Sequence, residues 1–331
     1  MTARTIDDQL TKYLVDAHSI EEQALIQLRV APRIAGDERL AEMFRQHRVE
    51  TEEQERLVSR RLEAHDASPS RLKKTVMKVG GAGFALFAAS QPDTPGKLTA
   101  HAYSYEHLEL ASYELLLRVA RRAGDDETAE VASRIRDQER AMAQRLEAAF
   151  DDAVRASLRD LQPDLPQQLN KYLADAHAIE AQAMQLLQRG PRIAGDEQLA
   201  TVLSEHLVET DRHQELVRER LEARGGSPSR LKDSAMRLGG LNWGGFFAAH
   251  PDTPGKLAAF AYAFEHLEIG GYEQLRRVAE TAGDPETVEV AQRILGEERA
   301  AAQRLAELWD RAMEASLEAA GVTERGVSPT A

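Results

Sequence analysis

The chain has 331 residues, of which 42% are hydrophobic and 29% charged, a balance that predicts a soluble globular protein of two ordinary-sized domains. Its net charge of −13 argues against nucleic-acid binding, which requires a basic surface, and the absence of cysteine excludes disulfides, thiol catalysis and thiolate metal ligands. No stretch suggests a transmembrane segment and the N-terminus shows no apolar signal region, so we expect a cytoplasmic protein.

The sequence consists of one unit that occurs twice. Pro32–Asp37 returns as Pro191–Asp196, an offset of 191 − 32 = 159, and Lys12–Leu14 returns as Lys171–Leu173 at the same offset. Because the offset never changes along the unit, the copies align without a gap. This pattern is typical of a duplicated domain and not of a solenoid of short repeats.

The expected domain boundaries follow from the repeat and from the prolines between its copies. Pro163 and Pro166 predict a linker, because proline ends the preceding helix. The polar stretch after Gly321 predicts a frayed end. We therefore expect a first domain over residues 1–160, a linker over 161–168, a second domain over 169–320 and a flexible tail over 321–331.

Cap and turn residues predict four long helices in each unit. Pro32 ends the first helix, and Asp37 caps the start of the second. Thr94-Pro95 opens the third helix, and Gly124 separates it from the fourth. No stretch alternates with period two, so we expect no sheet. In the first unit the predicted helices span residues 6–30, 37–64, 94–124 and 125–158.

The connections predict the topology. The first two helices are joined by a short turn, as are the last two, whereas the second and third are separated by residues 65–93, which are 93 − 65 + 1 = 29 residues. One long crossover is the arrangement of ferritin-like folds. We therefore predict an all-α protein with two tandem ferritin-like four-helix bundles, packed as an intrachain pseudo-dimer. The apolar crossover segments, residues 76–90 and 235–249, either pack across a bundle or contact a membrane surface.

Each predicted helix carries an apolar stripe that glutamate interrupts near its middle. On the third helix the stripe reads Leu98, Ala102, Glu106, Glu109, Tyr113 and Leu116. Because the interruptions fall at similar depth on four antiparallel helices, we expect their side chains to converge in each core. The predicted ligands are Glu21, His47, Glu50, Glu106, Glu109 and Glu139 in the first unit and Glu180, His206, Glu209, Glu265, Glu268 and Glu298 in the second.

This composition of the core predicts a metal site. Five buried carboxylates cannot all stay ionised together without cations. Oxygen-rich sites with one imidazole suit iron or manganese, and two ions per bundle fit the number of ligands. Two other interpretations remain open. The glutamates lie on the surface in i,i+4 pairs, or they form a metal-free, hydrogen-bonded polar core.

The same stretches resemble a known family. They are Asp16–Gln23, His47–Thr51, Glu106–Glu109 with Tyr113, and Glu139-Arg140, and their combination resembles the bacterial YciE/YciF-like ferritin-like proteins. The resemblance covers nearly the whole chain and implies a four-helix fold, a di-metal site and an association with stress responses. Members of that family are usually single-domain and similar to dimer-forming proteins, so the resemblance implies that this chain is a fused pair.

The sequence departs from the wider ferritin-like pattern in two places. His47-x-x-Glu50 replaces the usual Glu-x-x-His of the second helix. On the fourth helix, Met142 and Ala301 occupy the position of a second histidine ligand. These departures favour a ferroxidase-like centre, which can function with one histidine, over a symmetric di-iron oxygenase centre.

Residues beside the stripes distinguish the two units. Gln54 of the first unit is replaced by His213 in the second, one turn after Glu209, which makes His213 a candidate further ligand. We therefore expect the two sites to differ in affinity or metal preference. His107 and His266 neighbour stripe glutamates but point off the stripe, so we predict a structural role for them.

Tyr113 and Tyr272 lie on the stripe one turn from Glu109 and Glu268. Such tyrosines pack in the core, hydrogen-bond a ligand, or carry an electron in a redox site.

Together these patterns predict a di-metal carboxylate protein that oxidises Fe(II) with dioxygen or peroxide, or that consumes peroxide. The expected partners are metal ions and dioxygen or peroxide, and the expected state is a monomeric pseudo-dimer or a small homo-oligomer. The alternative, from a different functional class, is a non-enzymatic helical interaction protein whose metal-free polar core sets the register of the bundle.

Overall fold

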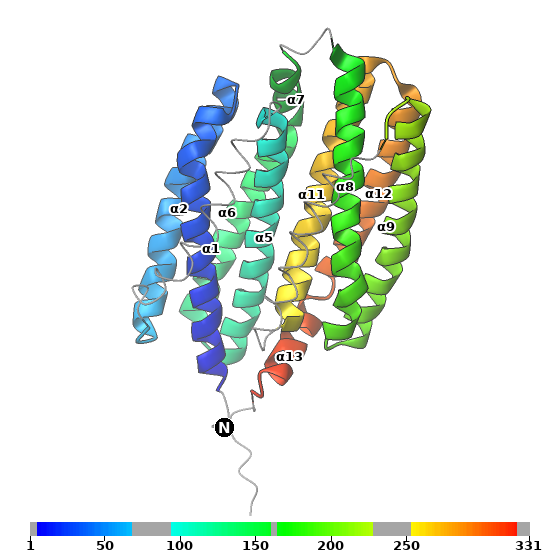
Figure 1. Cartoon of the computed structure of the whole chain (residues 1–331). Helices are drawn as coiled ribbons and strands as arrows, with labels where there is room; N and C mark the ends of the chain where they lie inside the picture. The colour runs from blue at the N-terminus through cyan, green and yellow to red at the C-terminus, as the bar shows by residue number, and fades with distance from the viewer. Residues whose placement is uncertain (1–4, 68–93, 160–163, 228–252, 323–331) are drawn as a thin grey trace, which may run out of the picture.

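The structure, a computed structural model, describes residues 5–67, 94–159, 164–227 and 253–322 (Figure 1). Every regular element in these ranges is an α-helix, which confirms the all-α prediction. The first repeat contains α1 (Ile6–Ile34), α2 (Glu38–Ala64), α5 (Thr94–Ala123), α6 (Asp126–Ala148) and α7 (Phe150–Leu158). The second contains α8 (Leu165–Ile193), α9 (Glu197–Ala223), α11 (Thr253–Ala282), α12 (Pro285–Ala306) and α13 (Trp309–Ala319).

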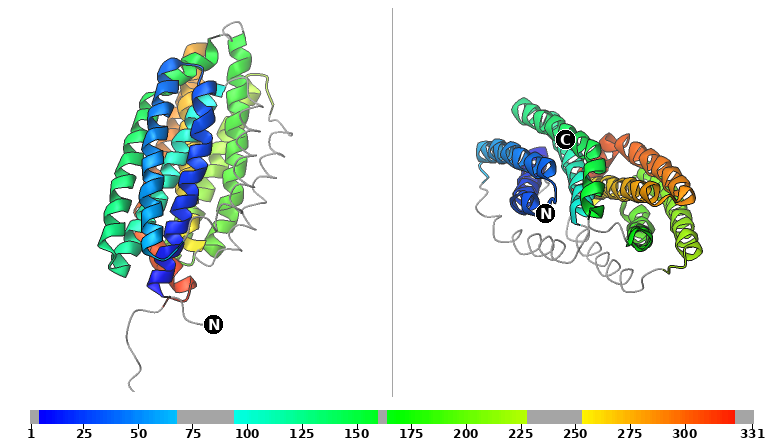
Figure 2. Two further views of the ribbon diagram at one scale, coloured as in Figure 1. Left: turned by 90° about the vertical axis from the view of Figure 1, so that its left-hand side faces the viewer. Right: turned by 90° about the horizontal axis from the view of Figure 1, so that it is seen from above.

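The four long helices of each repeat form a bundle. In the first repeat α1 packs against α2 and α5, and α6 packs against the same two helices. The second repeat has the same arrangement, with α8, α9, α11 and α12 in the corresponding places. Seen from above, the two bundles lie next to each other, and α5 and α11 lie side by side between them (Figure 2).

The contact between the repeats is reciprocal, as in a symmetric dimer. Lys97 Nζ lies 2.9 Å from a carboxylate oxygen of Asp175, and Lys256 Nζ lies 3.0 Å from one of Asp16. These are equivalent pairs, since 97 + 159 = 256 and 16 + 159 = 175. A surface that contacts its own copy in this way is isologous, so the chain is an intrachain pseudo-dimer.

The turn between α1 and α2 ends one helix and starts the next. Asp37 accepts hydrogen bonds from the amides of Arg39 at 2.9 Å and Leu40 at 3.3 Å, which is the predicted N-cap. Gly36 has a φ of +67°, and a Cβ there would lie 2.5 Å from the ring of Pro95 at the start of α5. α1 continues through Pro32 and ends at Ile34, four residues beyond the predicted residue 30 (34 − 30 = 4), because the left-handed Gly36 is the residue that terminates the helix.

The prediction of one continuous fourth helix was also wrong. The helix breaks at Ala149, and the short α7 then packs against both α5 and α11. Phe150 starts α7 fully buried, with its ring 5.5 Å from that of Tyr103, so an aromatic anchor accompanies the change of direction. The second repeat breaks in the same place, and Trp309 starts α13.

Some predicted segments fall outside the described residues. They include the apolar crossover segments 76–90 and 235–249, most of the tail, and residues 161–163 of the predicted linker. α8 already begins at Leu165, four residues before the predicted start of the second domain (169 − 165 = 4). In the described ranges no helix has the length and apolarity needed to cross a membrane.

Candidate metal centre

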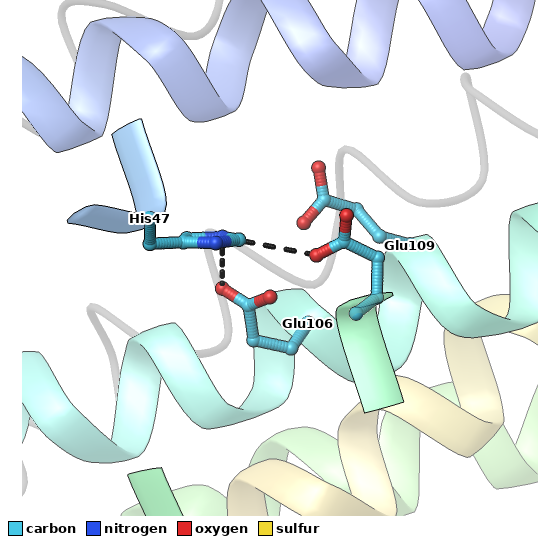
Figure 3. A group of neighbouring side chains, drawn as sticks. His47, Glu106 and Glu109 are labelled. Carbon is cyan, nitrogen blue, oxygen red and sulfur yellow. Dashed lines mark ion pairs between the residues drawn. The ribbon is translucent and has the colours of Figure 1, made fainter. Parts of the chain in front are cut away.

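One histidine and three glutamates gather in the core of the first repeat. His47 comes from α2, Glu106 and Glu109 come from α5, and Glu139 comes from α6. Each is buried, and each offers one ligand atom within 4.8 Å of the others. Glu106 and Glu109 share one face of α5 because they are three residues apart. Figure 3 shows the ring of His47 pointing from α2 into this group, with a dashed line to Glu106.

The orientation of His47 is fixed from outside the group. Its Nδ1 lies 3.2 Å from Glu50 Oε2, and because an ionised carboxylate only accepts, Nδ1 donates the hydrogen. In a neutral imidazole Nε2 then carries the lone pair. This atom faces Glu106 Oε1 at 3.2 Å and Glu139 Oε2 at 3.7 Å. A carboxylate that fixes the tautomer of a histidine in this way is typical of metal sites.

Glu50 therefore has a different position from the one predicted. Its side chain is 35% exposed, and both its oxygens bond the guanidinium of Arg145, at 3.2 and 2.6 Å. Glu50 comes three residues after His47 on α2, so it lies on the bundle side of the helix, but its carboxylate is at the rim of the core. Bonds from His47 and Arg145 lower the pKa of Glu50 to about 2, so it stays ionised. Arg145 was not among the predicted site residues, although its equivalent Arg304 recurs in the second unit.

Several atoms that face the centre of the group have no hydrogen-bond partner. They are His47 Nε2, Glu106 Oε2, Glu139 Oε2 and both oxygens of Glu109. The contact between His47 and Glu106 has the distance of a hydrogen bond but lacks its geometry. Leaving a buried polar group without a partner costs about 1–3 kcal/mol. A cation among these atoms would satisfy several of them together, so the residues fit a metal ion.

The electrostatics show what replaces a cation when none is bound. Burial raises the pKa of Glu109 and of Glu139 well above the usual value, and nearby carboxylates raise it further. Burial opposes a charge on His47, but Glu106, Glu50 and Glu139 outweigh it and raise its pKa well above the usual range. At neutral pH the metal-free group therefore holds protons, which a divalent cation would displace.

Glu21 occupies the side of the core next to this group. Tyr113, fully buried on α5, donates its hydroxyl hydrogen to Glu21 Oε1, and Glu21 Oε2 has no hydrogen-bond partner. Burial raises the pKa of Glu21 to about 8, although the bond from Tyr113 opposes the shift. Gln54 of α2 lies nearby and donates through Nε2 to Glu139 Oε1.

The second repeat contains the equivalent group. His206 Nε2 lies 2.7 Å from Glu265 Oε2 and 3.3 Å from Glu298 Oε2. Its Nδ1 lies 2.9 Å from Glu209 Oε2. Glu268 completes the group, and both its oxygens lack a hydrogen-bond partner. As in the first repeat, the predicted ligand Glu209 lies outside the group, where Arg304 bonds it at 2.6 Å.

A second group adjoins the first in this repeat, made of Glu180, His213 and Glu298. His213 Nδ1 lies 2.7 Å from Glu298 Oε1 and 3.8 Å from Glu180 Oε1. Burial would raise the pKa of Glu298, but His206 and His213 outweigh it and lower the pKa to about 2. Glu298 belongs to both groups and is therefore placed to bridge two ions. Tyr272 donates its hydroxyl hydrogen to Glu180.

His107 and His266 belong to the contact between the repeats and not to either group. Their rings stack with centroids 3.4 Å apart and planes 14° apart. Each donates Nδ1–H to the backbone carbonyl four residues earlier, on Tyr103 and Tyr262, at 2.7 Å. Burial lowers the pKa of His107 to about 4, so the stacked rings are neutral at physiological pH.

A pocket extends from the first centre between α1 and α5. It has Glu106 in its lining, together with Gln27, His101 and Tyr105. His101 Nε2 lies 3.2 Å from Gln27 Oε1. Gln27, His101 and Tyr105 are peculiar to the first repeat, because the equivalent residues in the second are Leu186, Phe260 and Phe264.

The family comparison agrees with the duplication. A family model described as "Domain of unknown function (DUF892)" matches the chain twice, over residues 5–159 and 165–318. No solved structure matches the chain.

Proposed function

The chain belongs to the DUF892 family, and we propose that each of its two domains is a ferritin-like metal centre that holds iron or manganese. The observation that supports this proposal is the buried histidine with three glutamates, whose unpartnered atoms converge in both repeats. Carboxylate oxygens with one imidazole and no sulfur suit iron or manganese better than copper or a structural zinc.

The residues have distinct parts in this proposal. In the first repeat His47, Glu106, Glu109 and Glu139 bind the ion, and Glu50 with Arg145 orients the imidazole. Glu21 and Tyr113 hold a proton beside the site. In the second repeat the binding residues are His206, Glu265, Glu268 and Glu298.

A bound iron or manganese ion would supply one-electron redox chemistry toward dioxygen or peroxide. Reduction of one hydrogen peroxide to two water molecules would consume two electrons, from two Fe(II) ions as substrate, and two protons. The bundle contributes by burying the site, so that the reactants meet away from bulk water. Oxidation of Fe(II) or removal of peroxide also agrees with the stress-response association that the family resemblance implies.

The test is metal content followed by reactivity. The untagged protein is loaded anaerobically with Fe(II) or Mn(II), desalted, and analysed for metal per chain. Glu106→Ala combined with Glu265→Ala removes one ligand from each centre, and we expect it to lose most of the metal. Addition of Fe(II) in air, followed by ferric absorbance, and of peroxide, followed by oxygen release, then distinguishes the two reactions.

The alternative is a metal-free polar core in a helical interaction protein. The raised pKa values of Glu109 and His47 are its support, because bound protons can also reduce the repulsion among the carboxylates. Loading well below one ion per chain, or loading that the double substitution leaves unchanged, would support this alternative and refute the metal centre.

A further inference from the structure

The two repeats differ at a buried position beside the candidate metal centre. Gln54 in the first repeat corresponds to His213 in the second, since 54 + 159 = 213. Both side chains are fully buried on the same face of equivalent helices. The substitution therefore changes the chemistry inside the core and not on the surface.

In the second repeat His213 has the surroundings of a metal ligand. It is 0% exposed, and its Nδ1 lies 2.7 Å from Glu298 Oε1 without hydrogen-bond geometry. Glu180 Oε2 and both oxygens of Glu298 also lack a hydrogen-bond partner. Unpartnered atoms of Glu180, His213 and Glu298 thus belong to one buried group, which adjoins the group formed by His206.

The other ring nitrogen of His213 hydrogen-bonds a carboxylate, as the second nitrogen of a metal-binding histidine usually does. Its Nε2 lies 2.6 Å from Glu297 Oε2, and Arg212 holds the same carboxylate oxygen. Since the carboxylate accepts, Nε2 donates, and in a neutral imidazole Nδ1 then carries the lone pair toward Glu298. This is the carboxylate–histidine arrangement that orients an imidazole toward a metal.

The supporting residues changed together with the ligand. The equivalents of Arg212, His213 and Glu297 in the first repeat are Glu53, Gln54 and Gln138. Glu53 bonds Arg56 at 3.2 Å on the surface, away from the core. The first repeat therefore lacks the imidazole, the carboxylate that orients it and the arginine that holds that carboxylate.

Gln54 also occupies the oxygen that a second ion would need. Its Nε2 donates to Glu139 Oε1, and Glu139 is the equivalent of the bridging Glu298. An amide hydrogen and a metal ion compete for the same lone pairs. Among the described residues of the first repeat, the four-residue group of His47 is accordingly the one cluster with metal-ligand spacing.

We propose that the second repeat binds two metal ions bridged by Glu298, whereas the first repeat binds one. The inference rests on the proposed metal centre and narrows the sequence prediction of two ions in each bundle. Glu180, His213 and Glu298 hold the additional ion, and Tyr272 positions Glu180 through its hydroxyl hydrogen. The chain as a whole then binds three ions.

The test exchanges the differing residues between the repeats. His213→Gln introduces the residue that the first repeat already accommodates, so it is compatible with the fold. We expect it to lower the saturating Mn(II) content from three ions per chain to two. The triple substitution Glu53→Arg, Gln54→His and Gln138→Glu should raise the content from three to four.

Electron paramagnetic resonance of the Mn(II)-loaded protein gives an independent reading. The wild type should show the spectrum of an exchange-coupled pair together with that of an isolated ion. The spectrum of the His213→Gln variant should contain only the signal of isolated ions. A metal content and spectrum that His213→Gln leaves unchanged would overturn the inference, since His213 would then be a protonated ion-pair partner of Glu180 and Glu298.

Failure of the inference and failure of the proposed function give different results. If the chain binds no Mn(II) above the level of the Glu106→Ala, Glu265→Ala variant, the proposed function fails. If Glu106→Ala and Glu298→Ala, measured separately, each remove the same number of Mn(II) ions, the proposed function stands and the inference fails, because Glu298 belongs to both groups of the second repeat.

Discussion

Replacement of Glu109 by methionine separates a metal site from a structural polar core. Glu109 is 1% exposed, and neither of its oxygens has a hydrogen-bond partner. Burial raises its pKa well above the usual value, so the fold holds this group against its preference for water. Methionine is apolar and of similar length, and it adapts to irregular core space. In the metal-free protein the substitution should therefore increase stability.

The expected size follows from the unpartnered atoms. A buried polar group left without a partner costs about 1–3 kcal/mol, and exchange of buried charges for apolar side chains stabilises by a similar amount. We expect Glu109→Met to raise the free energy of unfolding of the metal-free protein by about 1–3 kcal/mol. For a domain of this size that corresponds to about 2–4 °C in melting temperature for each kcal/mol.

The assay is thermal unfolding with a chelator and again with excess Mn(II). Each site should stabilise the wild type by about 4.1 kcal/mol when free metal is a thousandfold above its dissociation constant, which exceeds the gain from methionine, whereas the variant should lose the contribution of the first repeat. For the first repeat, Glu109→Met should therefore melt above the wild type with the chelator and below it with Mn(II). Glu130→Met, at an exposed position of α6, serves as the control and should show no reversal.

The opposite result would refute the reasoning. If Glu109→Met destabilises the metal-free protein by more than the control does, its carboxylate is part of a satisfied polar network. The convergence of glutamates would then specify the packing of the bundle, and no cation would be needed to explain it.

Three further predictions follow from the same structure. Because burial raises the pKa of Glu21 and Glu180 from 4.5 to about 8, their contribution to stability is complete below pH 4.5 and is lost as pH rises to about 8. In the presence of a chelator, these groups should lower the free energy of unfolding as pH rises from 5 to 8, which urea titrations detect. An increase traced to these groups would contradict their raised pKa values. Arg145→Met frees Glu50 from its anchor, so Mn(II) affinity of the first repeat, measured by competition titration, should fall about 10-fold or more; unchanged affinity would show that the orienting bond is dispensable. His107→Phe should leave the metal content unchanged, because this ring stacks between the repeats, and metal loss would place it in the centre after all.

The helix pattern made the bundle predictable because its signals are local. Asp37 accepts hydrogen bonds from the amides two and three residues after it, and such contacts can be recognised from neighbours in the sequence. The break at Ala149 was not predictable in the same way. It depends on the burial of Phe150 against α5 and α11, which are distant in sequence, and helix propensity continues through the break.

The convergence of the glutamates was predictable for a similar reason. Which of them enter the group and which orient the histidine was not. A stripe position fixes the side of the helix and leaves the direction of a long side chain open. Glu50 shares a stripe with His47, yet its carboxylate turns to Arg145 on α6, ninety-five residues away (145 − 50 = 95). Only the position of α6 beside α2 shows that Glu50 orients the histidine and does not belong to the group itself.

The fusion of the two repeats gives the unequal centres a physical basis. A dimer of identical chains has two identical sites, because each substitution appears on both sides of the axis. In this chain the contact at the axis has kept its symmetry, with Lys97 on Asp175 matched by Lys256 on Asp16. The cores could therefore diverge while the contact between them stayed reciprocal. His213 and its supporting residues represent such a divergence, and a covalently joined pair is the form of this fold in which one centre can acquire a second ion alone.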